Sequence, residues 1–121
     1  MQRAQSHYLR VAAMLLALGI IFSLFVLGAQ PVAVDLIPTP WDKLAHGVLF
    51  ALLACGIGFA SGLQVRQGLA VAIVVTMLIA VLDEWHQVYL PGRQASWGDL
   101  AADIAGSIIG AVLLATRRRF G

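Results

Sequence analysis

The chain has 121 residues, of which 60% are hydrophobic and only 12% are charged, a balance that excludes an ordinary soluble globular domain. Its net charge of +2 comes mainly from arginines beside apolar stretches, so the charge does not indicate a nucleic-acid partner. The single cysteine, Cys55, has no second thiol for an intramolecular disulfide or a thiolate metal site. We expect one membrane-embedded domain over residues 1–121.

The first apolar stretch, residues 8–29, follows Arg3 and Arg10, and a cleaved signal peptide is the alternative to a membrane helix. A cleaved signal has an apolar region of roughly 7–15 residues and a cleavage site with small residues two positions apart. This stretch is longer, and Leu27-Gly28-Ala29 is a poor cleavage site. We therefore expect a retained anchor helix.

A segment with three prolines (Pro31, Pro38 and Pro40) comes next. Proline removes a backbone donor and clashes with the preceding helical turn, so this segment is predicted to be a loop. Three further apolar spans are predicted at 41–62, 66–89 and 96–116. Because one bilayer crossing needs roughly 20 helical residues, four crossings leave only short loops. The predicted fold is an all-α, integral membrane four-helix bundle.

Charged residues divide between the two sets of helix ends. All six acidic residues lie at one set, and six of the eight basic residues lie at the other: Arg3, Arg10, Arg66, Arg117, Arg118 and Arg119. Basic residues mark the cytoplasmic side, and rings such as Trp85 and Trp97 favour a membrane boundary. Both termini are therefore predicted to be cytoplasmic, with the acidic end facing outward.

Small residues predict close helix packing. Gly106 and Gly110 form one GxxxG pair, and Gly58 and Gly62 form a second. Such faces let helix backbones approach closely in lipid. We expect these faces to pack within one chain rather than between chains, and the sequence leaves the oligomeric state open.

Two acidic residues are predicted to lie below the outer membrane surface. At about 1.5 Å per residue, Asp83 is about 25 Å from Arg66 along the third helix, and Asp103 is about 21 Å from Arg117 along the fourth. A charge at that depth is costly unless it faces the bundle interior and has a partner. We therefore expect both carboxylates to meet other polar groups between the helices.

Polar residues recur four positions apart on three of the predicted helices, so each pair shares one helix face. The pairs are Asp42 with His46, Asp83 with Gln87, and Asp99 with Asp103. Both outer loops lie on the same side, so we expect these faces to converge on one site, over which Arg93 can fold its guanidinium. The predicted binding residues are Asp42, Lys43, His46, Asp83, Glu84, Gln87, Arg93, Asp99 and Asp103, and the candidates for catalysis are Glu84, His46 and Asp83.

The predicted site has five carboxylates but only two fixed cations, Lys43 and Arg93. The surplus carboxylates could be protonated, paired with a charged His46 or His86, exposed to water, or occupied by a bound cation. An imidazole such as His46 suits a general base or a metal ligand, but we expect it to be hydrogen-bonded and assign no metal ligands. A purely structural network that joins the helix ends is the alternative to a binding site.

Several separated motifs resemble, in order and spacing, those of the VanZ-like family of small bacterial membrane proteins. They are Asp42-Lys43-x-x-His46, Asp83-Glu84-x-x-Gln87, Pro91-Gly92-Arg93, Asp99 and Gly106-x-x-x-Gly110. The resemblance covers residues 41–110. The sequence departs from the family pattern at Asp103, where the family usually has Asn, and at Gly47, where it usually has an aromatic residue.

The resemblance implies a multi-pass protein of the bacterial inner membrane with a role in the cell envelope. The family is named for a protein associated with resistance to the lipoglycopeptide teicoplanin, which raises a link to glycopeptide resistance. We expect the outward site to bind a membrane lipid headgroup or a lipid-linked wall precursor, with a glycopeptide as a further candidate. Arg93 and Lys43 would hold an anionic group. Neither a cofactor nor an enzymatic activity is assigned.

Two other functions stay open. A membrane-embedded hydrolase or transferase would act on lipid phosphate, with Glu84 or His46 as general base and Arg93 stabilising phosphoryl charge. A proton-coupled transporter would use the acids at membrane depth. However, no charged residue lies between Lys43 and Arg66, between Arg66 and Asp83, or between Asp103 and Arg117. A polar path across the membrane therefore has no visible cytoplasmic half.

Overall fold

The protein is an all-helical bundle in a computed structural model that describes residues 1–93 and 96–120. Its four long helices are α1 (Gln2–Phe22), α2 (Trp41–Ala60), α3 (Val65–Val88) and α4 (Trp97–Phe120). A π-helical turn, η1 (Ser23–Leu27), extends α1, and a short 3-10 turn, η2 (Pro31–Ala33), lies in the following loop. All four helices are long and apolar enough to cross a membrane, so the predicted fold class is confirmed.

The first and last helices extend beyond the apolar spans that the sequence defines. The first begins at Gln2 rather than at residue 8, and the last continues to Phe120 rather than ending at 116. Gln and Arg, which are common in these extensions, are good helix formers. The apolar spans therefore mark the segments that can lie in lipid, whereas the helices continue beyond them through residues that favour helix.

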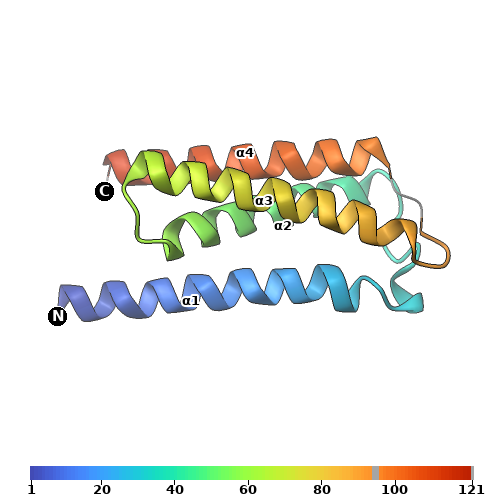
Figure 1. Ribbon diagram of the computed structural model, residues 1–121, viewed down its shortest axis with the longest axis horizontal. Coiled ribbons are helices and arrows are strands. Elements are labelled where there is room, and N and C mark those ends of the chain that lie inside the picture. The colour runs from blue at the N-terminus through green and yellow to red at the C-terminus, as the bar shows by residue number, and fades with distance from the viewer. Residues whose placement is uncertain (94–95, 121) are drawn as a thin grey trace.

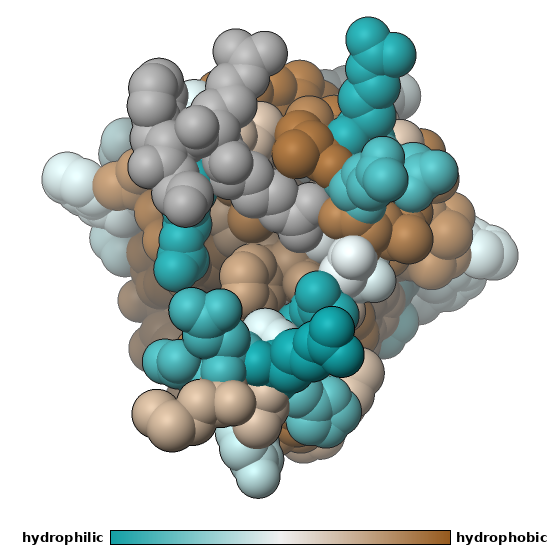
Figure 2. Space-filling model, turned by 90° about the vertical axis from the view of Figure 1, so that its left-hand side faces the viewer, coloured by the Kyte–Doolittle hydropathy of each residue, from teal (hydrophilic) through white to brown (hydrophobic). Residues whose placement is uncertain are grey.

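Both termini lie at one end of the bundle, and the α1–α2 and α3–α4 connections lie at the opposite end (Figure 1). We call the end with these two connections the loop end. At the end with the termini, hydrophilic residues form several groups among hydrophobic ones (Figure 2). The acidic positions of α2, α3 and α4 lie near the loop end, so the charge segregation seen in the sequence becomes a separation in space.

Side chains on the outer surface of the bundle are largely apolar. Leu15, Val74, Leu78, Val112 and Leu113 are all exposed, although each lies within a predicted span. The buried core is small and includes Phe50, Leu53 and Ala80, which are fully enclosed. Lipid is the solvent that such a surface requires.

The closest helix contact joins α2 and α4. A Cβ added to Gly106 would collide with the backbone of Gly47, and one added to Gly110 would collide with the backbone of Ala51. The Cys55 thiol also donates a hydrogen bond to the Gly110 carbonyl oxygen at 3.0 Å. The GxxxG pair of α4 therefore packs within the chain, as its spacing predicts.

We expect Gly106→Ala to lower the thermal stability of the protein, because the added methyl group would force α2 and α4 apart. Overpacking of this kind costs about 1–3 kcal/mol. Gly19→Ala in α1 is the matched control, since nothing lies within 4 Å of its added Cβ. Thermal unfolding in mild detergent, followed by circular dichroism, measures both variants. Equal melting temperatures for Gly106→Ala and the wild type would contradict the close contact.

Candidate functional site

Three helices bring polar side chains together at the loop end. Asp42, Lys43 and His46 lie in the first turns of α2, and Asp99 and Asp103 lie in the first turns of α4. The last turns of α3 supply three buried polar residues, Asp83, Glu84 and Gln87. The site is thus built where α2 and α4 begin and α3 ends.

The centre of the site is a cluster of His46, Asp83 and Asp103, one residue from each of the three helices. We call it the His–Asp cluster. His46 Nδ1 lies 2.9 Å from Asp103 Oδ1, and one ligand atom from each of the three residues lies within 4.8 Å of the others. The Asp103 and His46 side chains are 0% and 17% exposed, and Asp83 is 1% exposed. This cluster is therefore almost entirely removed from water.

Hydrogen bonds satisfy only part of the His–Asp cluster. Gln87 Nε2 donates to Asp83 Oδ2 at 3.3 Å, as the i, i+4 spacing predicts. Asp103 Oδ2, in contrast, is buried and has no hydrogen-bond partner among the described residues. A buried carboxylate oxygen without a partner loses the hydration it would have in water. The cluster therefore contains a buried carboxylate oxygen whose hydrogen-bonding capacity is not satisfied by the described residues.

Lys43 forms the ion pairs at the rim of the site. Its Nζ lies 3.0 Å from Asp99 Oδ1 and 3.9 Å from Asp42 Oδ2, and its side chain is 39% exposed. Within the described part of the chain, neither Lys nor Arg forms an ion pair with Asp83, Glu84 or Asp103. The surplus of negative charge predicted from the sequence is thus concentrated on the buried residues.

Two side chains of the site have partners that the sequence did not identify. His46 bonds across to Asp103 rather than to Asp42 of its own helix, and Asp42 Oδ1 is buried without a partner among the described residues. Arg93 forms no ion pair with a carboxylate in the described part of the chain, and its Nη2 donates to the Gly28 carbonyl oxygen at 2.7 Å. Arg93 therefore joins the α3–α4 connection to the end of the first span.

Glu84 faces a different neighbour from the adjacent Asp83. Its Oε2 accepts a hydrogen bond from the Ser96 backbone N–H at 3.0 Å, whereas its Oε1 is buried and has no partner among the described residues. Ser96 Oγ also accepts from the Asp99 N–H, which caps the start of α4. Sequence analysis did not include Ser96 in the site, although Ser96-x-x-Asp99 matches the spacing of a capping box.

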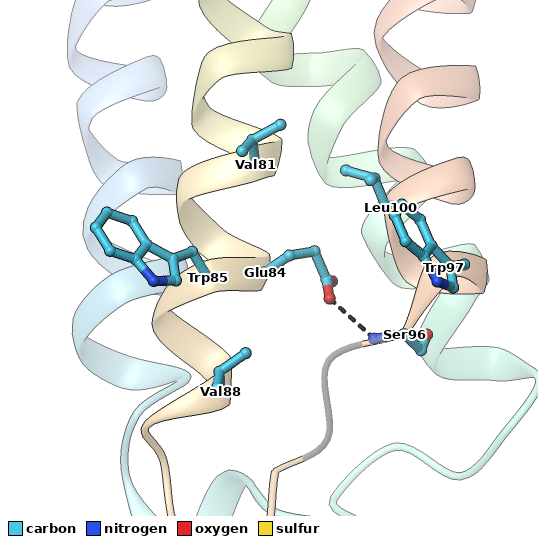
Figure 3. Close-up of a pocket in the computed structure, with 7 residues that line it drawn as sticks. All are labelled: Val81, Glu84, Trp85, Val88, Ser96, Trp97 and Leu100. Atoms are coloured by element: carbon cyan, nitrogen blue, oxygen red, sulfur yellow. Dashed lines mark hydrogen bonds between the residues drawn. The ribbon is translucent and has the colours of Figure 1, made fainter.

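An apolar groove of about 540 Å³ lies beside Glu84, between α3 and α4. Its walls are formed by Val81, Trp85, Val88, Ser96, Trp97 and Leu100. Figure 3 shows Glu84 extending from α3 toward Ser96 at the start of α4. Trp85 and Trp97 are 61% and 86% exposed, so the groove opens on the lateral surface of the bundle. The groove was not predicted, because it depends on the separation of two helices.

Buried hydroxyl groups farther from the loop end bond to their own helices. Thr76 Oγ1 donates to the Ala72 carbonyl oxygen at 2.6 Å, and Ser107 Oγ donates to that of Asp103 at 2.8 Å. Such bonds to the preceding helical turn are common for Ser and Thr in membrane helices. These two side chains therefore do not continue the His–Asp cluster toward the other end of the bundle.

The family model described as VanZ/LLP1 matches residues 3–118, which is nearly the whole chain. The chain belongs to this family. The VanZ-like assignment made from the motifs of residues 41–110 is thereby confirmed. No curated protein and no solved structure matches the chain significantly. Family membership and four candidate spans establish a multi-pass VanZ-like membrane protein.

We expect His46 and Asp103 to be energetically coupled in this VanZ-like protein. In a double-mutant cycle with His46→Ala and Asp103→Ala, the coupling should be about 1.5–3 kcal/mol, because a buried hydrogen bond to a charged group joins them. The same cycle on Lys43 and Asp99 should give a smaller coupling, because water screens that pair. Thermal unfolding in detergent measures both cycles, and additive effects at His46 and Asp103 would contradict the predicted coupling.

Proposed function

We propose that this VanZ-like protein binds a phosphate-bearing membrane lipid at the loop end of the bundle. The observation that carries the proposal is the apolar groove between α3 and α4, which has the Glu84 carboxylate at its polar edge. An amphiphile that enters sideways from the bilayer meets apolar walls first and polar groups next. Trp85 and Trp97 are suited to the boundary between chains and headgroups.

The polar edge of the groove offers acceptors for a lipid headgroup. Glu84 Oε1 is buried and has no partner among the described residues, so a hydroxyl group of the headgroup could donate to it. Glu84 is also within electrostatic range of Asp99 and Asp103, which joins the groove to the other acids of the site. Headgroup hydroxyls are therefore favoured next to Glu84, whereas a phosphate placed there would be repelled.

The phosphate of the lipid would bind at Lys43. This ammonium group has three donors and is half-exposed, so its pairs with Asp99 and Asp42 leave a donor for an anionic ligand. A glycerophospholipid and a lipid-linked wall precursor share this chemistry: a phosphate ester, hydroxyl groups and an aliphatic chain. Binding of the second class would connect the protein to the cell wall and, through it, to glycopeptide resistance.

The proposed location is the bacterial inner membrane, with both termini in the cytoplasm and the loop end outside. Six of the eight basic residues lie near the helix ends on the side of the termini, which supports this orientation. The lipid would then bind at the outer leaflet. Lipid-linked wall precursors are used on that side of the membrane.

A second candidate function is hydrolysis or transfer of a lipid phosphate, and the His46–Asp103 contact favours it. A histidine whose ring is held by a buried carboxylate is the arrangement of an oriented general base. The His46 side chain is 17% exposed, whereas Asp83 and Asp103 are enclosed. In this case the lipid bound in the groove would be a substrate rather than a retained ligand.

We expect Val81→Trp to reduce lipid retention by about tenfold or more, equal to about 1.4 kcal/mol, because the indole would fill the groove. Val74→Trp is the matched control: Val74 lies on the same helix, is 65% exposed and does not line the groove. Native mass spectrometry of protein from mild detergent would measure the bound lipid after incubation with equimolar phosphatidylglycerol or a polyprenyl phosphate.

Comparing the two lipids distinguishes a glycerophospholipid ligand from a lipid-linked wall precursor, since both carry a phosphate group. Preferential retention of the polyprenyl phosphate would identify a wall-precursor site, whereas preference for phosphatidylglycerol would identify a bulk-lipid site. Lys43→Gln should weaken retention in both arms, because the phosphate loses its cation. If Val81→Trp, Val74→Trp and wild-type protein retain both lipids equally, the groove is not the binding site.

The enzymatic alternative predicts turnover that depends on His46. Purified wild-type protein incubated with a radiolabelled polyprenyl diphosphate, with and without divalent metal ions, should release phosphate, and His46→Gln should abolish the release. Val74→Trp should keep the wild-type rate. If the protein retains lipid but releases no phosphate with or without metal ions, its function is lipid binding and not catalysis.

A further inference from the structure

The His–Asp cluster joins three helices through a set of metal-binding side-chain types. His46 comes from α2, Asp83 from α3 and Asp103 from α4, and one ligand atom of each lies within 4.8 Å of the others. We propose that these three residues bind a divalent transition-metal ion, with Zn²⁺ as the reference ion. This assignment goes beyond the sequence analysis, which expected His46 to be only hydrogen-bonded.

The unpartnered oxygen of Asp103 is the observation that points to a ligand. Asp103 is 0% exposed, its Oδ1 contacts His46, and its Oδ2 is buried without any hydrogen-bond partner among the described residues. A carboxylate oxygen that is buried without a hydrogen-bond partner loses its hydration without a compensating interaction, which costs free energy. A metal ion between the three side chains would restore the missing interaction.

The charges of the cluster favour a cation over a further hydrogen-bond donor. Asp83 and Asp103 are both enclosed, yet His46 is the only basic side chain that forms an ion pair with either, within the described residues. With both carboxylates ionised, the net charge of the cluster is −1 if His46 is protonated and −2 if His46 is neutral. A divalent ion bound by neutral His46 and both carboxylates would balance these charges within the low-dielectric interior.

The distances in the cluster are close to those of a coordination shell. Two ligands at about 2.1 Å from a tetrahedrally coordinated Zn²⁺ are about 3.4 Å apart. His46 Nδ1 and Asp103 Oδ1 are slightly closer, at 2.9 Å. The donor atoms of all three residues lie within 4.8 Å of one another, which is somewhat farther than in such a shell. Small side-chain rotations would therefore complete the shell.

The donor set selects the class of metal ion. One imidazole and two carboxylates suit Zn²⁺ and Mn²⁺, whereas Mg²⁺ and Ca²⁺ prefer sites built from oxygen alone. Affinity in such sites rises from Mn²⁺ to Zn²⁺. Gln87 Nε2 donates to Asp83 Oδ2 and would hold that carboxylate in orientation, as outer hydrogen bonds do in known metal sites.

The proposed metal site and the proposed lipid groove are separate sites, and neither requires the other. The three metal ligands do not line the apolar groove, and Glu84, which does, is not one of them. The protein would bind the ion in lipid-free detergent. A negative lipid experiment would therefore not contradict the proposed metal site, and a negative metal experiment would not contradict the proposed lipid groove.

The experiment uses the full chain, stripped with a chelator and dialysed in detergent against micromolar Zn²⁺, Mn²⁺ or Mg²⁺. Elemental mass spectrometry of the retained ion should give one Zn²⁺ per chain, weaker retention of Mn²⁺ and none of Mg²⁺. Asp103→Asn and Asp83→Asn should each weaken Zn²⁺ affinity by at least about tenfold. Asp35→Asn is the matched control, because Asp35 is an exposed acid of the first loop.

Folding of each variant is checked by size-exclusion chromatography, and Co²⁺ absorption provides a readout on wild-type protein that does not depend on any variant. A Co²⁺ spectrum in the visible range that is lost on addition of one equivalent of Zn²⁺ would show that both ions share a single site. Wild-type protein that retains no Zn²⁺ would overturn the proposal. Zn²⁺ retention equal in Asp35→Asn, Asp83→Asn and Asp103→Asn would also overturn it, since the ion would then bind elsewhere.

Discussion

The close contact between α2 and α4 is the constraint on which the site depends. Hydrophobic burial does not drive helices together in lipid, so association relies on backbone approach and on polar contacts. Gly106 rests against Gly47, and Gly110 rests against the next turn of α2. Asp103 precedes Gly106 by one helical turn, and His46 precedes Gly47 by one residue. The contact that packs the two helices therefore also sets the 2.9 Å distance between His46 and Asp103.

Sequence spacing predicted which residues turn inward but not which partners they meet. Asp83, Gln87 and Asp103 are buried as expected, because an unpartnered charge facing lipid is costly and i, i+4 positions share a face. The sequence did not identify the partner of His46, because its own helix offers Asp42 one turn earlier whereas the rotation of α2 against α4 presents Asp103. Periodicity describes one helix at a time, whereas glycine contacts between helices decide the rotation.

The two adjacent acids of α3 divide the loop end into two parts. Successive helical residues differ by about 100° in direction, so Asp83 and Glu84 face different neighbours. Asp83 joins the His–Asp cluster, and Glu84 meets the Ser96 N–H beside the groove. The sequence indicated both acids and the boundary position of Trp85 and Trp97, but the groove between them needs the α3–α4 separation. Helix–helix distances are not visible in the pattern of one chain.

The charge of the His–Asp cluster would influence the proposed binding of a headgroup at the loop end. Asp83, Glu84 and Asp103 form no ion pair with Lys or Arg in the described chain, and a phosphate would be attracted to Lys43 at the rim. A divalent ion on the cluster would remove most of the opposing negative potential, because charges interact strongly in a low-dielectric interior. Ion and lipid phosphate would then each strengthen the binding of the other by the same factor, although they occupy separate sites. The buried carboxylate surplus would weaken the binding of an anionic ligand at the loop end, and a bound cation would offset that repulsion.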